Sequence, residues 1–160
     1  MNPPSTAVEE LTATELGAWR GLLRVHTALV RELDAELDAA HDLPLSSYDV
    51  LIYLQAAPDR RLRMAELADS VLLSRSGVTR LVDRLEREGL IERDACTSDG
   101  RGLFAVLTEK GDDLLAHARP THLAGVRERF LSHFSEDELQ MLARFWERVH
   151  PGAADLIDGD

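Results

Sequence analysis

The stretch from Ser74 to Thr108 constrains the fold of this chain more than any other part of the sequence. In its first half, apolar residues recur at i, i+3, i+4 and i+7, the spacing of one helix face: Val78, Leu81, Val82 and Leu85. The opposite side carries hydroxyl and guanidinium groups, on Ser76, Thr79, Arg80, Arg84 and Arg87. A short helix with an apolar back and a polar, basic front is typical of a helix that lies in a DNA major groove.

The residues around this helix predict a helix-turn-helix followed by a wing. Met64–Val71 has the apolar spacing of a short helix, two leucines make a turn, and Ser74 is placed to cap the next helix. Gly89 ends that second helix. Leu90–Ala95 and Leu103–Leu107 then predict two strands joined by a Gly-rich turn. A β-hairpin directly after such a helix is the wing of a winged helix.

The N-terminal part of the chain predicts a long helix with an apolar seam. Residues 1–13 lack a regular spacing, so we expect a flexible lead-in there. Seam positions then alternate in steps of three and four residues: Leu16, Trp19, Leu23, His26, Val30, Leu33 and Leu37. Leu22 and Leu29 widen this stripe, which indicates burial against more than one neighbour. A chain this short most easily supplies that extra surface by dimerising.

Other helix boundaries are marked by capping residues and prolines. Start signals occur at three further places: the S-x-x-D motif of Ser46 and Asp49, Thr108, and the capping box Ser135–Glu138. Pro58 should end the helix that begins near Ser46, and Leu62 and Met64 should form a brief strand. Pro120 should kink or restart the long helix that follows Thr108, because proline lacks an N–H and clashes with the preceding turn.

Length and composition favour one mainly helical folding unit. The 160 residues are 44% hydrophobic but only 5% aromatic, so we expect a mainly α fold with a small β-hairpin wing. We expect a single domain at 14–160, with dimerisation helices at 14–42 and 109–150 and a winged helix-turn-helix lobe at 46–108. No segment reaches 18 uncharged apolar residues, and the first residues do not resemble a secretory signal. We therefore expect a cytoplasmic protein without membrane contact.

The charge distribution separates this lobe from the rest of the chain. A net charge of −11 argues against a nucleic-acid partner, because lysine and arginine supply much of the affinity for phosphate. Between Arg61 and Gly102, however, eight arginines balance eight acidic residues, so the whole net charge lies outside this segment. The asymmetry favours a DNA-facing module on an acidic body.

The order and spacing of these segments resemble the MarR family of bacterial winged-helix transcriptional regulators, over roughly Leu11 to Val149. Five pieces carry the resemblance: Tyr48–Leu51, Met64–Ala68, Ser74–Ile91, the Asp99-x-Arg101 turn and Leu107–Gly111. It implies a homodimer with interlocked terminal helices that binds double-stranded DNA at a pseudopalindromic operator, represses nearby genes and is released by a small ligand. Three residues depart from the family pattern in the wing: Gly100, Gly102 and Ala105.

The predicted DNA contacts lie on the second helix and in the wing turn: Ser74, Arg75, Ser76, Thr79, Arg80, Arg84, Asp99 and Arg101. Arg80 is suited to donate two hydrogen bonds to a guanine edge. Arg101 could enter a narrow minor groove, braced by Asp99. Asp83 should pair with Arg80 or Arg87. Arg87 itself and Arg93 are interpreted as solvated charges.

A regulatory ligand is predicted from the resemblance and from the residue types near the junction of body and lobe. Six side chains could stack on and hydrogen-bond an anionic aromatic compound, such as a phenolic acid or a purine: Trp19, Arg20, Arg24, His26, Tyr48 and Asp49. Each also has a structural interpretation, as a seam residue or part of a helix start. Cys96, the only cysteine, leaves thiol-based redox control as an alternative.

The sequence contains no motif of an enzyme that we recognise. P-loop, dinucleotide-binding and nucleophile-elbow motifs are absent, and the six histidines are scattered, so we predict no catalysis, no cofactor and no metal site. The remaining alternative is a winged helix that binds another protein instead of DNA.

Overall fold

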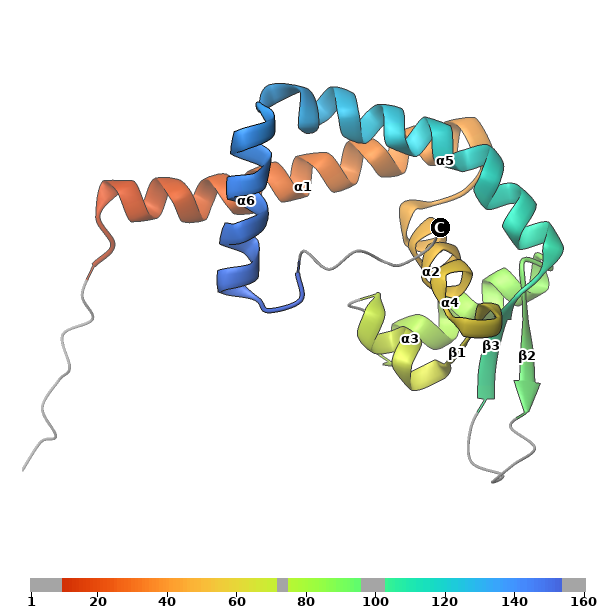
Figure 1. Ribbon diagram of the computed structural model, residues 1–160. Helices are drawn as coiled ribbons and strands as arrows, with labels where there is room; N and C mark the ends of the chain where they lie inside the picture. The colour runs from red at the N-terminus through yellow and green to blue at the C-terminus, as the bar shows by residue number, and fades with distance from the viewer. Residues whose placement is uncertain (1–9, 72–74, 96–102, 154–160) are drawn as a thin grey trace, which may run out of the picture.

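The computed structural model describes residues 10–71, 75–95 and 103–153. The elements follow one another as α1 (Ala13–His41), α2 (Leu45–Ala56), η1 (Pro58–Arg60), β1 (Arg61–Arg63), α3 (Met64–Ser70), α4 (Arg75–Arg87), β2 (Ile91–Ala95), β3 (Leu103–Leu107), α5 (Glu109–Arg129), η2 (Leu131–His133) and α6 (Glu136–Val149). Figure 1 shows two parts: an arm formed by α1, α5 and α6, and a lobe formed by α2, α3, α4 and the strands. The expected mainly helical fold with a small wing is confirmed.

The hydrophobic core lies in the lobe and at its junction with the arm. Large side chains with less than 2% of their surface exposed come from every helix of the lobe, from β2, from the end of α1 and the link that follows it, and from the first half of α5: Leu37, Leu43, Val50, Leu51, Leu54, Leu67, Val78, Val82, Leu85, Ile91 and Leu115. The lobe is therefore anchored to the arm by shared core packing.

The wing is part of a three-stranded antiparallel sheet in the order β1-β3-β2. Leu62 pairs with Ala105 in the register, so the expected brief strand exists as β1, but it ends at Arg63 and Met64 begins α3. Ala105 and Leu107 are buried, whereas Phe104 and Val106 are half-buried, as expected for a strand with one face on the core. One sheet face thus packs on the lobe and the other faces outward.

Helices α1 and α5 lie side by side in the arm (Figure 1). Near the end of α5, the guanidinium of Arg129 forms ion pairs with Glu32 and Glu36 on α1. A Cβ on Gly125 would lie 2.5 Å from a carboxylate oxygen of Glu36, so glycine permits this close approach. Among the described residues, no helix combines the length and apolar character needed to cross a bilayer.

Helix starts follow the predicted caps at two places and differ at two others. The hydroxyls of Thr108 and Ser135 accept backbone N–H groups as predicted. Helix α1 begins with a capping box of Thr12 and Glu15 that the spacing did not reveal. The expected flexible lead-in of residues 1–13 therefore overlaps the start of this helix. The prediction of a cap at Ser46 is wrong. Helix α2 begins one residue earlier, after Pro44, and Ser46 lies inside it.

Glycine and proline positions mark the remaining boundaries. Gly89 has a φ of 74°, and the chain leaves α4 there, as expected. A Cβ at Gly111 would lie 2.2 Å from the carbonyl oxygen of Leu90, which fixes how closely α5 begins against the wing. Helix α5 continues through Pro120 without restarting, and it curves along its length in Figure 1.

Candidate nucleic-acid interface

Helix α4 has two chemically distinct faces, as its sequence predicts. Val78, Val82 and Leu85 are at most 1% exposed and pack in the lobe core. Thr79 and Arg80 are exposed on the opposite face. The burial of the apolar face holds α4 against α3, so the polar face is turned toward solvent.

The structure describes only part of the predicted DNA contacts. Ser74, Asp99 and Arg101 lie outside the described residues, as does Cys96. Arg75 and Ser76 form the first turn of α4, where only the backbone is described.

Arg84 lies on α4 but is engaged within the helix. Its Nε donates to Oε1 of Glu88 at 2.9 Å, an i, i+4 pair, and this hydrogen bond raises the pKa of the guanidinium. Both side chains are about two-fifths exposed, so the pair can open at little cost when phosphate competes for the arginine.

Arg93 joins the wing to α4, so its interpretation as a solvated charge is wrong. The side chain is 21% exposed, and its guanidinium forms ion pairs with two acidic residues of α4, Asp83 and Glu86, the latter at 2.8 Å. Arg87 contacts the backbone carbonyl of Asp83 at 3.2 Å. The Arg93 bridge fixes the orientation of β2 relative to α4. No local spacing signals it, because the partners lie seven and ten residues away.

Two arginines and a phenylalanine form a stack on the outer face of the sheet. The guanidinium carbons of Arg61 and Arg63 lie 4.1 and 5.2 Å from the ring centre of Phe104. Arg61 also forms an ion pair with Asp94 of β2 at 3.4 Å. Sequence reasoning missed this group because β1 and β3 are about forty positions apart, and only their register brings the residues together.

Tyr48 and Asp49 lie where the arm meets the lobe. Tyr48 is 3% exposed, and its ring centre is 4.5 Å from that of His122 on α5. Burial raises the pKa of the Tyr48 hydroxyl and lowers the pKa of His122. Asp49 lines a hollow of about 350 Å³ between α1, α2 and the end of α3, with Arg31 and Asp34. Desolvation there raises the pKa of Asp49 to about 6.

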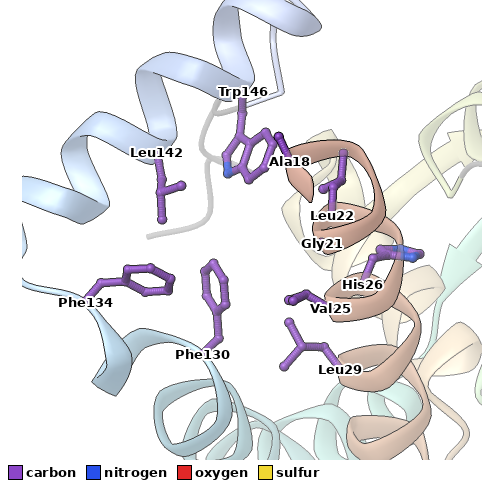
Figure 2. A pocket seen from close by; sticks show the side chains of 10 residues that line it. All are labelled: Ala18, Gly21, Leu22, Val25, His26, Leu29, Phe130, Phe134, Leu142 and Trp146. Carbon is purple, nitrogen blue, oxygen red and sulfur yellow. The ribbon is translucent and has the colours of Figure 1, made fainter. Parts of the chain in front are cut away.

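A larger, apolar groove runs between α1 and the end of the arm. Its volume is about 440 Å³, and its walls are Ala18, Gly21, Leu22, Val25, His26, Leu29, Phe130, Phe134, Leu142 and Trp146. Figure 2 shows Phe130, Phe134 and Trp146 directed toward the face of α1 that carries Leu22. His26 and Trp146 are the residues of this lining that carry polar side-chain atoms.

The predicted effector residues are distributed over separate parts of the protomer. His26 lines the apolar groove, Arg24 borders a shallow hollow on α1, and Asp49 lines the polar hollow. Trp19 and Arg20 are exposed on α1. Each of the three hollows therefore contains one of these side chains and does not gather the set.

Comparisons of this chain with a family model and with known proteins agree on one family. A model of the MarR family matches residues 41–102, which include the lobe's helices. The HTH-type transcriptional regulator MhqR of Bacillus subtilis is 36% identical over 109 residues, covering 68% of this chain and 73% of that protein. An uncharacterised HTH-type transcriptional regulator of Bacillus cereus is 33% identical over 132 residues, or 82% of this chain and 86% of its own length.

Solved structures agree over a larger share of the chain. AbsC, a MarR family transcriptional regulator from Streptomyces coelicolor, superposes with a TM-score of 0.84 at 34% identity and covers 89% of this chain and 95% of its own. Sco3205, a MarR family transcriptional regulator from the same organism solved in complex with DNA, gives a TM-score of 0.86 at 33% identity over 96% of both chains. This chain therefore belongs to the MarR family of transcriptional regulators.

Proposed function

We propose that this protein binds a specific double-stranded DNA sequence through α4 and the wing. The observation that carries the proposal is the division of α4 into a buried apolar face and an exposed face with Thr79 and Arg80. The likeness of this protein to Sco3205, which was solved in complex with DNA, supports DNA binding by the lobe. In this proposal Arg80 contacts a guanine edge, and Arg101, from the sequence alone, enters the minor groove.

Protection of DNA upstream of the protein's own gene tests this function. We expect two protected half-sites about one helical turn apart, with affinity that falls steeply as salt rises. Arg80→Ala should cost about 1 to 3 kcal/mol of binding free energy at the guanine that it contacts. If neither upstream DNA nor mixed-sequence DNA is bound, the winged helix serves another partner, and a protein-interaction module becomes the better explanation.

The protein acts as a homodimer in this proposal. The apolar groove of Figure 2 and the surrounding arm leave large hydrophobic side chains exposed: Leu11, Trp19, Leu22, Leu23, Val25, Val30, Leu123, Met141, Phe145, Trp146 and Val149. So much exposed apolar surface on α1 and α6 is typical of a partner interface rather than of a monomer surface. A second copy of the arm would cover it and place two lobes on one DNA duplex.

A small anionic aromatic effector that releases DNA completes the proposed repressor. The support is that one predicted effector residue, Asp49, lines the hollow at the junction of arm and lobe, where Arg31 supplies a positive charge. Binding should raise the melting temperature of the protein and weaken its DNA affinity. The test adds phenolic acids and purines one at a time to the complex. If neither the melting temperature nor the DNA affinity changes, the ligand-responsive part of the proposal is wrong, and the proposal of DNA binding still stands. An oxidant added to the complex in parallel tests whether oxidation of Cys96 releases the DNA.

A further inference from the structure

We propose that Arg63 is a DNA phosphate contact, held in place by the ring of Phe104 on the outer face of the wing sheet. The inference rests on the proposed DNA-binding function and adds a residue that neither helix periodicity nor the wing turn predicts. It depends on the position of Arg63 in the sheet, on its charge surroundings and on the ring contact.

Arg63 lies at the point where the wing sheet meets the helix-turn-helix. It is the last residue of β1, and Met64 begins α3 directly after it. Its register partner is Phe104, the second residue of β3, which places Arg63 toward the end of the sheet where the wing hairpin turns. Arg61 pairs with Val106, two positions farther from that turn. In the proposed binding mode the wing turn enters the minor groove, so this end of the sheet lies nearer the DNA.

The two arginines on this face differ in their charge surroundings. Asp94 balances Arg61 at 3.4 Å. None of the ion pairs formed between described residues includes Arg63. Glu66, three residues away, uses Oε2 to accept the backbone N–H of Arg63 at 2.9 Å. The positive charge of Arg63 therefore remains available at the turn end of the sheet.

The ring contact positions Arg63 without consuming its hydrogen bonds. Its guanidinium carbon lies 5.2 Å from the centre of the Phe104 ring, within the range of a cation–π attraction. This attraction acts on the charge and uses none of the five N–H donors, which suit a phosphate. A half-buried arginine held on one ring loses less conformational entropy when it binds phosphate than an unrestrained side chain does.

The test measures how the affinity for a labelled duplex of mixed sequence depends on salt. Each arginine that contacts phosphate contributes about 0.9 to the slope of log K against log salt concentration, so a dimer with two Arg63 residues contributes about 1.8. We expect Arg63→Gln to reduce the slope by about that amount and Arg63→Lys to keep it. The matched control is Arg61→Gln, which removes the same charge from the same ring and should leave the slope unchanged.

The outcomes separate this inference from the proposed function. If the wild-type protein binds the duplex and Arg63→Gln leaves the slope unchanged, the phosphate contact is overturned while DNA binding stands. If Arg61→Gln lowers the slope as much as Arg63→Gln, the effect is one of general charge, and the assignment to Arg63 is again overturned. If the wild type binds no DNA, both proposals fail. If Arg63→Gln melts at a lower temperature than the wild type, the measurement is repeated with Arg63→Met, which keeps an unbranched stem against the ring.

Discussion

The lobe and the arm bury apolar surface in opposite ways. Leu51, Leu54 and Leu85 in the lobe are completely buried within one chain. Helix α6 of the arm, by contrast, contains no buried residue, and its Trp146 remains 36% exposed. Both parts are amphipathic in sequence, but only the lobe contains the neighbours that cover its apolar face. An amphipathic pattern therefore shows which face of an element packs against a neighbour, and it does not show whether that neighbour lies in the same chain.

The largest expected effect comes from a charge placed in the arm's groove. Leu22→Asp should abolish dimerisation, because an aspartate on this apolar wall would have to lose its hydration in the dimer. Light scattering should then give the mass of one chain instead of two, and cooperative DNA binding should be lost. Leu103→Asp is the matched control for the mass measurement, since Leu103 is similarly exposed but lies in the lobe. If the wild-type protein is already a monomer, the arm does not need a second chain to cover its apolar surface, and the contrast between arm and lobe is wrong.

A truncation in the lobe core should cost stability directly. Leu85 is completely buried, so Leu85→Ala should lower the free energy of unfolding by about 2 to 5 kcal/mol. Urea unfolding measures this difference, and the loss should persist at every protein concentration. A loss that disappears at high concentration would mean that the lobe, too, depends on dimerisation.

A smaller effect is expected where the arm caps a lobe helix. Oδ1 of Asp34 on α1 accepts the backbone N–H of Leu45, the first residue of α2, at 2.8 Å. Asp34→Ala should therefore lower the unfolding free energy by about 0.5 to 2 kcal/mol, as the loss of a helix cap does. Asp38→Ala, one turn farther along α1 and exposed, is the control and should be nearly neutral. Equal losses in the two variants would contradict a capping role.

The last expected effect is a pH dependence at the junction. The folded protein raises the pKa of Asp49 to about 6, above the value of an unfolded aspartate, so folding favours the protonated form. This contribution to stability is fully present below about pH 4 and is lost as pH rises through about 6. Asp49→Asn should flatten the melting temperature in this window and raise it slightly at neutral pH. A steeper profile in the variant would contradict the shift.

The sequence predicted the candidate interface in part. The helix-turn-helix, both faces of α4, the limits of β3 and the turn at Gly89 follow from spacings of one to four residues, and the structure confirms them. Arg93 was misinterpreted because its acidic partners lie on another element. Ser46 was misinterpreted because Asp34, eleven residues before Leu45, already satisfies the first N–H of α2.

The sequence by itself determined the local structure of this protein, because helix periodicity, caps and turns depend on residues within about one turn of each other. It also determined that the segment from Arg61 to Gly102 is neutral and the rest of the chain acidic. Only the tertiary structure decided which charges meet. The bridges from Arg93 to α4 and from Arg129 to α1, and the stack of Arg61 and Arg63 on Phe104, join residues that are distant in sequence. Ion pairs and ring contacts act over a few ångströms, so they exist only after packing has brought their elements together.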